Sequence, residues 1–270
     1  MDAKLADKYD ALCASIAGKG RVAVAFSGGV DSTLLLKAAT DATKGKVIAL
    51  LAATPLQPEA ETREAVNTAA AIGASLQVRN INPLLWPEFV KNPPDRCYHC
   101  KKAIYSDFKQ FLNDQPDTVL MDGTNIDDLQ EDRPGHRAIN ELGVATPLVE
   151  AQLDKTEIRT ISRTLQLATW DKPTASCLAT RIASGLAIDK KKLAVVARCE
   201  AHLHDLGAHD CRVRIRLDNT AVIELISNDF KLLNEQEIRT KVRFFFKSMG
   251  LQKVFLDLSE RKGKLKKPNP

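Results

Sequence analysis

Short apolar runs alternate with longer amphipathic stretches over the first half of the chain. The runs are rich in Val, Ile, Leu and Ala and have the length of buried strands. They lie at 22–26, 46–53, 75–81 and 117–121. The stretches between them, such as 31–40 and 59–72, repeat apolar residues at helical spacing. Strands that alternate with helices in this way predict an α/β fold, a doubly wound parallel sheet with helices on both faces.

The pattern changes near residue 188. Asp189 is placed to cap a helix that ends at Gly207, and Asp218-Asn219 lies between two β-branched runs as a hairpin turn. The expected elements are a helix to 206, strands at 211–217 and 220–226, a helix at 236–249 and a strand at 253–258. They predict a small C-terminal α+β domain with an antiparallel sheet. We therefore expect a first domain over 1–187 and a second over 188–270.

Three segments fit neither pattern. Residues 82–95 carry four prolines and are expected to form a loop, after which Asp95 caps the next helix. Residues 124–135 are polar and acidic, which suits either a lid over a site or an ordinary solvated loop. Residues 169–185 are too broken for a regular element. Just before them, the spacing of Asp and Glu at 154–157 predicts a capping box that opens a helix.

Composition limits the class of protein. The chain has 270 residues, 44% of them hydrophobic and 27% charged, which is ordinary for a globular protein. The longest apolar run, 47–53, is too short to span a bilayer, and residues 1–17 have the mixed charges of an amphipathic helix, not of a signal peptide. We expect a cytoplasmic protein with no membrane contact. The net charge is +5, and the basic residues 261–270 are either a solvated terminus or an RNA-binding arm.

A glycine turn joins the first predicted strand to the first predicted helix after it. Ser27-Gly28-Gly29 brings the chain to a helix N-terminus, where free N–H groups and the helix dipole favour an anion. Ser32 can add a hydroxyl donor. Asp31 places a carboxylate beside that anion, which is unusual for a phosphate site unless Mg²⁺ bridges the two. No GxxxxGK[ST] sequence is present, so the turn is not a Walker loop.

The six residues SGGVDS at 27–32 resemble the signature of the PP-loop ATP pyrophosphatases, also called adenine nucleotide alpha hydrolase-like proteins. The resemblance implies that the turn holds the β,γ-pyrophosphate of ATP and leaves the α-phosphate open to attack. It also implies adenylation of a substrate oxygen followed by displacement of AMP. The alternative is a glycine turn of the kind found in any doubly wound fold.

Two cysteines stand one turn apart at the start of a predicted helix. Cys97 and Cys100 lie where the helix dipole favours thiolates, but two thiolates do not complete a tetrahedral metal site. Cys177, in the irregular segment, is the candidate third ligand. Spacing alone leaves three alternatives open: a metal site, a redox pair or a chance pair of core cysteines. The other cysteines, expected in the core, are Cys13, Cys199 and Cys211.

Three arginines alternate with apolar residues in the predicted hairpin. Arg212, Arg214 and Arg216 share one face of the strand because side chains alternate with a period of two. Guanidinium groups in line suit a phosphate or carboxylates through bidentate contacts. The alternative is a solvent-exposed face whose charge is balanced by acids such as Glu224.

Together with SGGVDS, the segments PDRCYHCKK, DKPTASCLATRI and CRVRIRLDN and the helix around Glu200 resemble the LarE family over nearly the whole chain. The resemblance implies an ATP-dependent, AMP- and pyrophosphate-forming sulfurtransferase. Its substrate would be pyridinium-3,5-biscarboxylic acid mononucleotide, whose carboxylates are adenylated and converted to thiocarboxylates for the nickel-binding cofactor of lactate racemase. A homo-oligomer, namely a hexamer, is also implied.

The resemblance assigns site residues by position. The implied catalytic and substrate-binding residues are Cys177, Glu200, Arg212, Arg214 and Asp229. The implied nucleotide contacts are Ser27, Gly28, Gly29, Asp31, Ser32, Gly123 and Arg181. ATP and Mg²⁺ are the implied ligands at the glycine turn.

The family has two branches that differ in the source of sulfur. One sacrifices a cysteine at the position of Ser176, and the other uses three cysteines that hold a [4Fe-4S] cluster. This chain resembles the second branch, with Cys97, Cys100 and Cys177 as the implied ligands. Such a cluster keeps one iron without a protein ligand, where hydrosulfide from an external source can bind, so Cys177 would keep its own sulfur.

Three other functions are consistent with parts of the pattern. A PP-loop tRNA thiolase with an iron–sulfur cluster would explain the basic tail, but no RNA-binding domain is evident and no nucleic-acid partner is expected. An ATP-dependent amidotransferase is the weaker choice because no ammonia-producing domain is evident. From another class, the chain could be a non-catalytic nucleotide-binding protein with structural zinc at Cys97 and Cys100.

Overall fold

The computed structural model describes residues 2–130, 134–173, 177–259 and 261. The chain divides into two compact units, the first of Met1–Pro83 with Asp95–Thr174 and the second of Leu84–Pro94 with Ala175–Pro270. The chain thus enters the second unit briefly before it returns to complete the first. By this division residues 175–187, expected at the end of the first domain, belong with the second unit.

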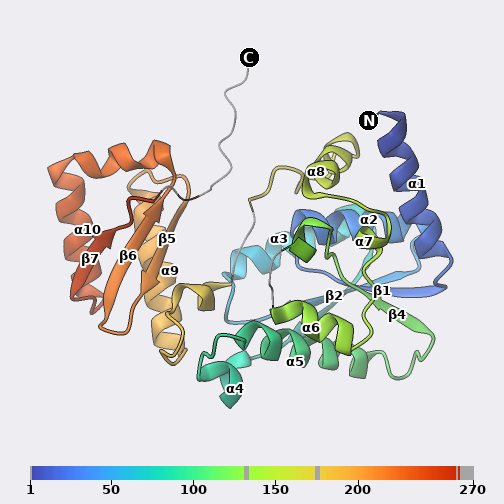
Figure 1. The fold of residues 1–270 in the computed structure, drawn as a ribbon, viewed down its shortest axis with the longest axis horizontal. Helices are drawn as coiled ribbons and strands as arrows, with labels where there is room; N and C mark the ends of the chain where they lie inside the picture. The colour runs from blue at the N-terminus through green and yellow to red at the C-terminus, as the bar shows by residue number, and fades with distance from the viewer. Residues whose placement is uncertain (1, 131–133, 174–176, 260, 262–270) are drawn as a thin grey trace. The chain divides into compact units, whose positions relative to one another are not determined.

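The first unit is a parallel sheet flanked by helices (Figure 1). Its strands are β1 (Arg21–Ala25), β2 (Val47–Ala53), β3 (Ser75–Asn80) and β4 (Thr118–Met121), in the order β3-β2-β1-β4. Its helices are α1 (Ala3–Ala17), α2 (Val30–Ala42), α3 (Glu59–Ile72), α5 (Arg96–Phe111), α6 (Pro134–Glu141), α7 (Pro147–Glu150) and α8 (Lys155–Thr164). The α/β fold predicted from the sequence is confirmed.

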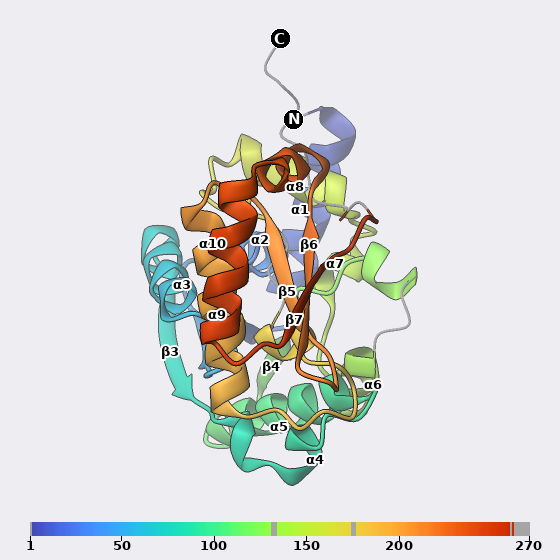
Figure 2. The same ribbon diagram turned by 90° about the vertical axis from the view of Figure 1, so that its left-hand side faces the viewer.

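Helices cover both faces of this sheet. Leu12 of α1, Leu35 of α2 and Ile161 of α8 join Val22 and Val24 of β1 in one core cluster. In Figures 1 and 2 these three helices lie above the sheet, and α5 and α6 lie below it. The predicted capping box is present at the start of α8. Burial of each of these leucine or isoleucine side chains contributes about 2 kcal/mol to the stability of the fold. The cluster therefore holds α2, and with it the glycine turn at its N-terminus, against the sheet.

The strand order creates a switch point between β1 and β4. The chain leaves β1 through α2 toward β2, and it reaches β4 from β3 through α5, on the opposite side. Connections that diverge in this way open a crevice outside the carboxyl ends of the two strands, where doubly wound folds bind ligands. The glycine turn follows β1, and Asp122-Gly123 follows β4. The fold therefore brings these two loops to one place.

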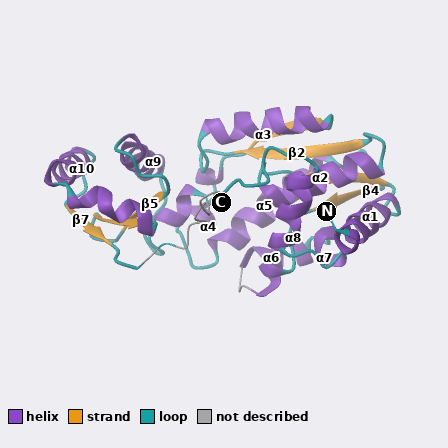
Figure 3. Cartoon of the chain, turned by 90° about the horizontal axis from the view of Figure 1, so that it is seen from above, coloured by secondary structure: helices purple, strands orange, loops and turns teal. Residues whose placement is uncertain are grey.

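The second unit is a three-stranded sheet with helices packed against it (Figure 2). Its strands are β5 (Cys211–Ile215), β6 (Thr220–Leu225) and β7 (Lys253–Leu256), and its main helices are α9 (Lys190–Asp205) and α10 (Gln236–Ser248). Figure 3 shows both helices on the same side of the sheet. The predicted hairpin is confirmed, but the fully antiparallel sheet is wrong, because β7 pairs with β6 in parallel. The crossover through α10 turns the chain back to the direction of β6.

Two of the irregular segments contain short helices. Residues 82–95, predicted as a loop, include the 3₁₀ turn η1 (Pro83–Leu85) and α4 (Pro87–Val90), each with proline at or near its first position. Residues 169–185 include the turn η3 (Leu178–Arg181). Asp95 precedes α5, yet its side chain makes no capping hydrogen bond, because its backbone is not extended. Its carboxylate lies 3.5 Å from Nε2 of His99 instead.

None of the helices in the described part of the chain is long and apolar enough to cross a membrane.

Candidate active site

A cavity of about 510 Å³ opens in the crevice at the switch point. This volume is in the usual range for small-molecule sites. The loop after β1 and the first turn of α2 contribute Ser27, Asp31 and Ser32. The segment after β4 contributes Asp122, Gly123, Thr124 and Asp128, and α5 contributes Cys97, Lys101 and Tyr105. The start of α6 adds residues 134–136. All of these residues belong to the first unit.

The glycine turn has the geometry that an anion site requires. Gly28 has a φ of +70°, and a Cβ there would lie 2.7 Å from that of Ala65. Gly29 is the N-cap residue of α2, and no side chain of the described residues caps the helix, so its first N–H groups are left for a ligand. The hydroxyls of Ser27 and Ser32 lie 3.1 Å apart, and that of Ser32 donates to the carbonyl of Gly29 at 3.2 Å, so both would turn to donate to a bound phosphate. These features fit the phosphates of ATP.

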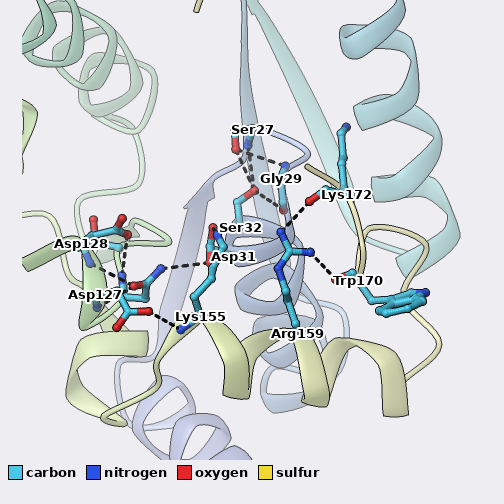
Figure 4. Close-up of polar contacts among 12 residues, drawn as sticks. Ser27, Gly29, Asp31, Ser32, Asp127, Asp128, Lys155, Arg159, Trp170 and Lys172 are labelled. Atoms are coloured by element: carbon cyan, nitrogen blue, oxygen red, sulfur yellow. Dashed lines mark hydrogen bonds and ion pairs between the residues drawn. The ribbon is translucent and has the colours of Figure 1, made fainter. Parts of the chain in front are cut away.

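Asp31 is balanced within the protein. One carboxylate oxygen forms an ion pair with Lys155, and the other accepts a hydrogen bond of 3.2 Å from Nδ2 of Asn125 (Figure 4). Lys155 is the first residue of α8, and its backbone N–H donates to Asp127 at 3.0 Å. The carboxylate that was predicted to need Mg²⁺ as a counter-ion therefore already has a cation beside it. A carboxylate facing the cavity with one lysine partner still suits Mg²⁺ that arrives with a nucleotide.

The back of the turn is held by the segment after α8. Nζ of Lys172 donates to the carbonyl of Gly28 at 3.1 Å and lies 3.0 Å from a carboxylate oxygen of Glu64. Arg159 donates to the carbonyls of Trp170 and Lys172 at 2.7 and 2.8 Å, as Figure 4 shows. These contacts hold the carbonyl of Gly28 and therefore the backbone of the turn in place.

The acidic loop begins as part of this site. Thr124 and Asn125 are buried, and Asn125 is only 1% exposed. Oδ1 of Asn125 accepts hydrogen bonds of 2.9 and 3.2 Å from the backbone N–H groups of Asp127 and Asp128. This pattern holds the 3₁₀ turn η2 (Asp127–Gln130) in place. Residues 131–133 of the loop lie outside the described residues, so the lid hypothesis stays a hypothesis.

Asp122 is the centre of a buried polar network. It accepts hydrogen bonds from the hydroxyls of Tyr105 and Thr124 and from the N–H of Thr124 at 2.8 Å. Nζ of Lys101 lies 3.3 Å from its second oxygen. Burial alone would raise the pKa of Asp122, but Lys101 and these hydrogen bonds outweigh burial and lower it. Burial and the neighbouring carboxylate raise the pKa of Tyr105 well above its usual value, so Tyr105 stays a neutral donor.

Gly123 lets the loop after β4 approach the helix that starts at the glycine turn. A Cβ at Gly123 would lie 3.0 Å from the backbone nitrogen of Ser32 and 3.2 Å from the carbonyl carbon of Asp31. Any larger residue would have to push the loop away from α2. The predicted role of Gly123 near the nucleotide is therefore compatible with its position.

The cysteines differ in their surroundings. Cys97 lines the cavity and Cys100 follows one turn later on α5, while Cys177 is the N-cap residue of η3 in the second unit. Within the described residues, no group of three or more His, Cys, Asp or Glu side chains forms an assembled metal site. Ser176 lies outside the described residues. The donor chemistry of three thiols nevertheless fits an iron–sulfur cluster.

The remaining cysteines are in or near the core, as predicted. Cys199 is fully buried and Cys211 nearly so. Burial raises the pKa of each thiol to about 12, which makes both of them poor nucleophiles. Cys13 is half-buried on α1, and burial raises its pKa as well.

The arginine face of β5 is present, but its members are not equivalent. Strand register places Arg212 opposite Glu224 and Arg214 opposite Val222. The carboxylate of Glu224 nevertheless takes Arg214, through two contacts, and Nη1 of Arg214 also donates to the carbonyl of Thr180 at 2.8 Å. Arg214 is thus a balanced arginine, as the solvent-face hypothesis expected.

Arg212 has no such partner among the described residues. Its Nε is buried without a hydrogen-bond partner there. Burial and the nearby positive charges of Arg261, Arg181 and Arg214 lower its pKa to about 10. Arg212 is itself half-buried, and Glu224, opposite it in the strand pair, partly offsets these positive charges.

Two acids of the second unit have structural contacts. Oε1 of Glu200 accepts from Nε of Arg181 and from the N–H of Val213, both at 3.0 Å. Asp229 is 3% exposed and accepts from the backbone N–H groups of His209 and Asp210 at 2.8 and 3.1 Å. Burial would raise the pKa of Asp229, but the His209 ring and these N–H groups lower it. Glu200 thus holds the backbone of β5, and Asp229 holds the residues just before it.

Comparison with known proteins identifies the family. No family model matches the chain. It is 33% identical over 260 residues to the pyridinium-3,5-bisthiocarboxylic acid mononucleotide synthase of Lactiplantibacillus plantarum, covering 95% of this chain and 92% of the relative. The chain belongs to the LarE family. It also shares 36% identity with an uncharacterized protein of Synechocystis, over 88% of each chain. An uncharacterized protein of Methanocaldococcus jannaschii is 32% identical over 88% of this chain and 89% of its own length.

Several residues of this LarE protein's cavity were not found from the sequence. Lys155, Lys101, Tyr105 and Asp122 act together with residues far away in the chain. The capping box did mark the start of α8, but not the direction in which Lys155 points. Helical spacing from Cys97 to Lys101 and Tyr105 was the one signal that could have placed all three on the cavity face.

Proposed function

We propose that this LarE protein is an ATP-dependent sulfurtransferase that forms AMP and pyrophosphate. Its substrate would be pyridinium-3,5-biscarboxylic acid mononucleotide, and its product the thiocarboxylate used in the nickel-binding cofactor of lactate racemase. The observation that carries the proposal is the anion-binding turn at 27–29, which opens into a ligand-sized cavity beside Cys97. The similarity to the synthase of Lactiplantibacillus plantarum supports the choice of substrate.

Adenylation follows from the chemistry of the glycine turn. The N–H groups of the turn and the Ser27 and Ser32 hydroxyls would hold the β- and γ-phosphates of ATP. A substrate carboxylate oxygen then attacks the α-phosphorus, the bond to the bridging oxygen breaks, and pyrophosphate leaves with the electron pair. Mg²⁺ held by Asp31 would neutralise charge on the phosphates. Lys155 and Asn125 keep the Asp31 carboxylate turned toward the cavity.

Sulfur transfer completes the reaction. Sulfide attacks the acyl carbon of the adenylated carboxylate, a C–S bond forms, and the C–O bond to AMP breaks. We propose that Cys97, Cys100 and Cys177 hold a [4Fe-4S] cluster, which when bound supplies an iron without a protein ligand as the point of entry for external sulfide. Cys177 then keeps its sulfur.

The second unit would bind the substrate mononucleotide. Nε of Arg212 has no hydrogen-bond partner among the described residues, and a phosphate or carboxylate of the substrate would supply one. Arg214 lies on the same face of the strand. Glu200 fixes both the backbone of β5 and the side chain of Arg181, so it would position the arginine face. We also propose a role for Asp229 in shaping the neighbouring loop and a homo-oligomeric, cytoplasmic protein.

The direct test is a product analysis. Protein purified without oxygen is incubated with ATP, Mg²⁺, the pyridinium mononucleotide and sulfide. We expect one AMP and one pyrophosphate for each thiocarboxylate group formed, over many turnovers per chain. AMP release without any thiocarboxylate, or no dependence on the mononucleotide, would contradict the proposed function.

Metal and mass analysis test the sulfur source. Iron and acid-labile sulfide in the purified protein support the cluster, whereas zinc alone would favour the structural-zinc alternative. Replacing Cys97, Cys100 or Cys177 by Ala should remove iron and thiocarboxylate formation but leave AMP release. The buried Cys199→Ala variant is the matched control. Loss of H₂S from Cys177 after turnover, seen as dehydroalanine, would show a sacrificial cysteine instead.

A further inference from the structure

The cavity beside the glycine turn contains a cation that the proposed reaction has not yet used. We infer that Lys101 binds the α-phosphate of the nucleotide and follows it from ATP to the adenylated substrate and to AMP. Among the described residues that line this cavity, Lys101 is the only Lys or Arg. This inference rests on the proposed function and names a further binding residue for it.

The position of Lys101 separates it from the pyrophosphate site. The glycine turn and α2 form one wall of the cavity, and α5 contributes Lys101 to the lining together with Cys97 one turn earlier. The turn has enough donors for the β- and γ-phosphates but no positive side chain. A phosphate that extends from the turn into the rest of the cavity enters the space that Lys101 lines together with Cys97. Sulfur is proposed to enter at Cys97, which lines the same cavity, so the phosphate near Lys101 is the one attached to the reacting carboxylate.

Lys101 is held in place from behind. Its Nζ lies 3.3 Å from Oδ2 of Asp122 and 5.2 Å from the centre of the Tyr105 ring. The same Asp122 oxygen accepts the Tyr105 hydroxyl, while Thr124 occupies the other oxygen. Both oxygens of the Asp122 carboxylate therefore have partners, which oppose its rotation. Asp122 and Tyr105 are positioning residues, which fix an ammonium group that has donors left for a phosphate oxygen.

The matching lysine next to it does something else. Lys102 points to Glu141 and to the hydroxyl of Tyr98 at 2.9 and 2.8 Å, and it does not line the cavity. These contacts join α5 to α6. Two neighbouring lysines of one helix thus serve different surfaces, which provides a control of equal charge.

The test compares ligands that share or lack the α-phosphate. Binding of AMP, adenosine and inorganic pyrophosphate is measured by calorimetry on the wild-type protein and on Lys101→Met and Lys102→Met. Lys101→Met should weaken AMP at least about tenfold, the value of one charge-assisted contact, and leave adenosine and pyrophosphate within about twofold. Lys102→Met should change none of the three. Iron content of each variant shows that the cysteine site is intact.

A double-mutant cycle tests the positioning residues. Tyr105→Phe should weaken AMP binding while Lys101 is present and should have no further effect in Lys101→Met, because Tyr105 acts through Lys101. An effect of equal size in both backgrounds would show a merely structural role. This cycle partner also keeps the inference testable if Lys101→Met folds poorly.

The possible failures are distinct. If the wild type binds neither ATP nor AMP, the proposed function fails and the role of Lys101 fails with it. If the wild type binds AMP and releases it during turnover, but Lys101→Met binds it equally well, only the inference about Lys101 is wrong. A rise in the KM for sulfide with unchanged AMP affinity would also overturn it, because it would assign Lys101 to the sulfur.

Discussion

The cavity of the first unit and the arginine face of the second both concentrate charge, but they balance it differently. Around the cavity, Asp31 has Lys155, and Asp122 has Lys101 with two hydroxyl donors. On the arginine face, Arg214 takes Glu224 and leaves Arg212 without a hydrogen bond at Nε in the described chain. In the first region the acidic side chains have partners, and the groups left for a ligand are backbone N–H groups at the start of α2. The second lacks an anion at one side chain.

This difference indicates which kind of ligand group each region receives. A turn with unused N–H groups binds phosphate wherever the backbone is held correctly, so its specificity is for shape and charge together. The guanidinium of Arg212, whose Nε has no partner among the described residues, can instead bind one acidic group of a ligand. We therefore expect side-chain changes to act mainly on geometry in the first region and mainly on affinity in the second.

The largest effect is expected from Asp31→Asn. Removing this carboxylate takes away the proposed Mg²⁺ ligand and leaves Lys155 without its partner, so AMP release should fall by about 100-fold or more. The control is Asp41→Asn near the other end of α2, where the lost acid pairs with Lys37. AMP release at the wild-type rate in Asp31→Asn would remove the role of this carboxylate. Rates are followed by chromatography of the nucleotides.

Arg212 and Arg214 test the second region against each other. Arg212→Met should weaken binding of the mononucleotide by about 10- to 100-fold and leave stability unchanged or slightly higher, because a half-buried charge beside other arginines is removed. Arg214→Met should cost about 1–3 kcal/mol of stability, because the partly buried Glu224 loses its partner. Calorimetry and urea unfolding measure the two quantities. If both variants lose affinity and stability equally, the distinction between a balanced and an unbalanced arginine is wrong.

The two adjacent glycines sharpen the role of geometry in the first region. A Cβ at Gly28 meets Ala65 at 2.7 Å and φ there is +70°, so Gly28→Ala should cost about 1–3 kcal/mol. Gly29 has a φ of −85°, and a Cβ there meets nothing closer than 3.5 Å. Gly29→Ala should therefore change stability by less than about 0.5 kcal/mol. Urea unfolding midpoints of the two variants decide it, and equal midpoints would contradict the geometry.

The smallest effect concerns the pH dependence that Asp229 gives to the second unit. Its pKa is lowered in the folded protein, so its ionised form contributes stability above its unfolded pKa, about 3.9, and loses it as the pH falls through the lower folded value. Asp229→Asn should cost about 1–2 kcal/mol at pH 7 and flatten the acid slope. Unfolding by urea between pH 5 and 2.5 measures this slope. An unchanged slope would mean that the His209 and Asp210 contacts do not persist in solution.

Local pattern was enough to predict most of the framework. The strands and helices of the first unit, the capping box at Asp154 and Glu157, and the hairpin of β5 and β6 all depend on neighbouring residues. The glycine turn was found because a strand, two glycines and a helix follow one another directly. The core position of Cys199 followed from helical spacing. In each case the deciding contacts are close in sequence.

Contacts between distant residues explain what the sequence could not give. Lys155 meets Asp31 across 124 positions, and Tyr105 meets Asp122 from another element. Strand register alone predicts that Glu224 pairs with Arg212, which lies directly opposite it. In the structure the Glu224 carboxylate instead pairs diagonally with Arg214. The direction of β7 depends on how α10 packs, which no local pattern records. These choices are made by tertiary packing, so they belong to no single stretch of sequence.

The brief excursion of residues 84–94 into the second unit has a consequence for synthesis on the ribosome. Asn92 is fully buried, and its side-chain amide donates to the carbonyls of Ile182, Ala183 and Leu186. Those partners are translated at least 90 residues later, roughly 5 to 20 s at ordinary elongation rates. The first unit likewise waits for its returning segment. Neither unit can therefore complete its fold before part of the other has left the ribosome. Residues 84–94 are exposed during this interval, and a chaperone that covers them would bind the nascent chain at that stage.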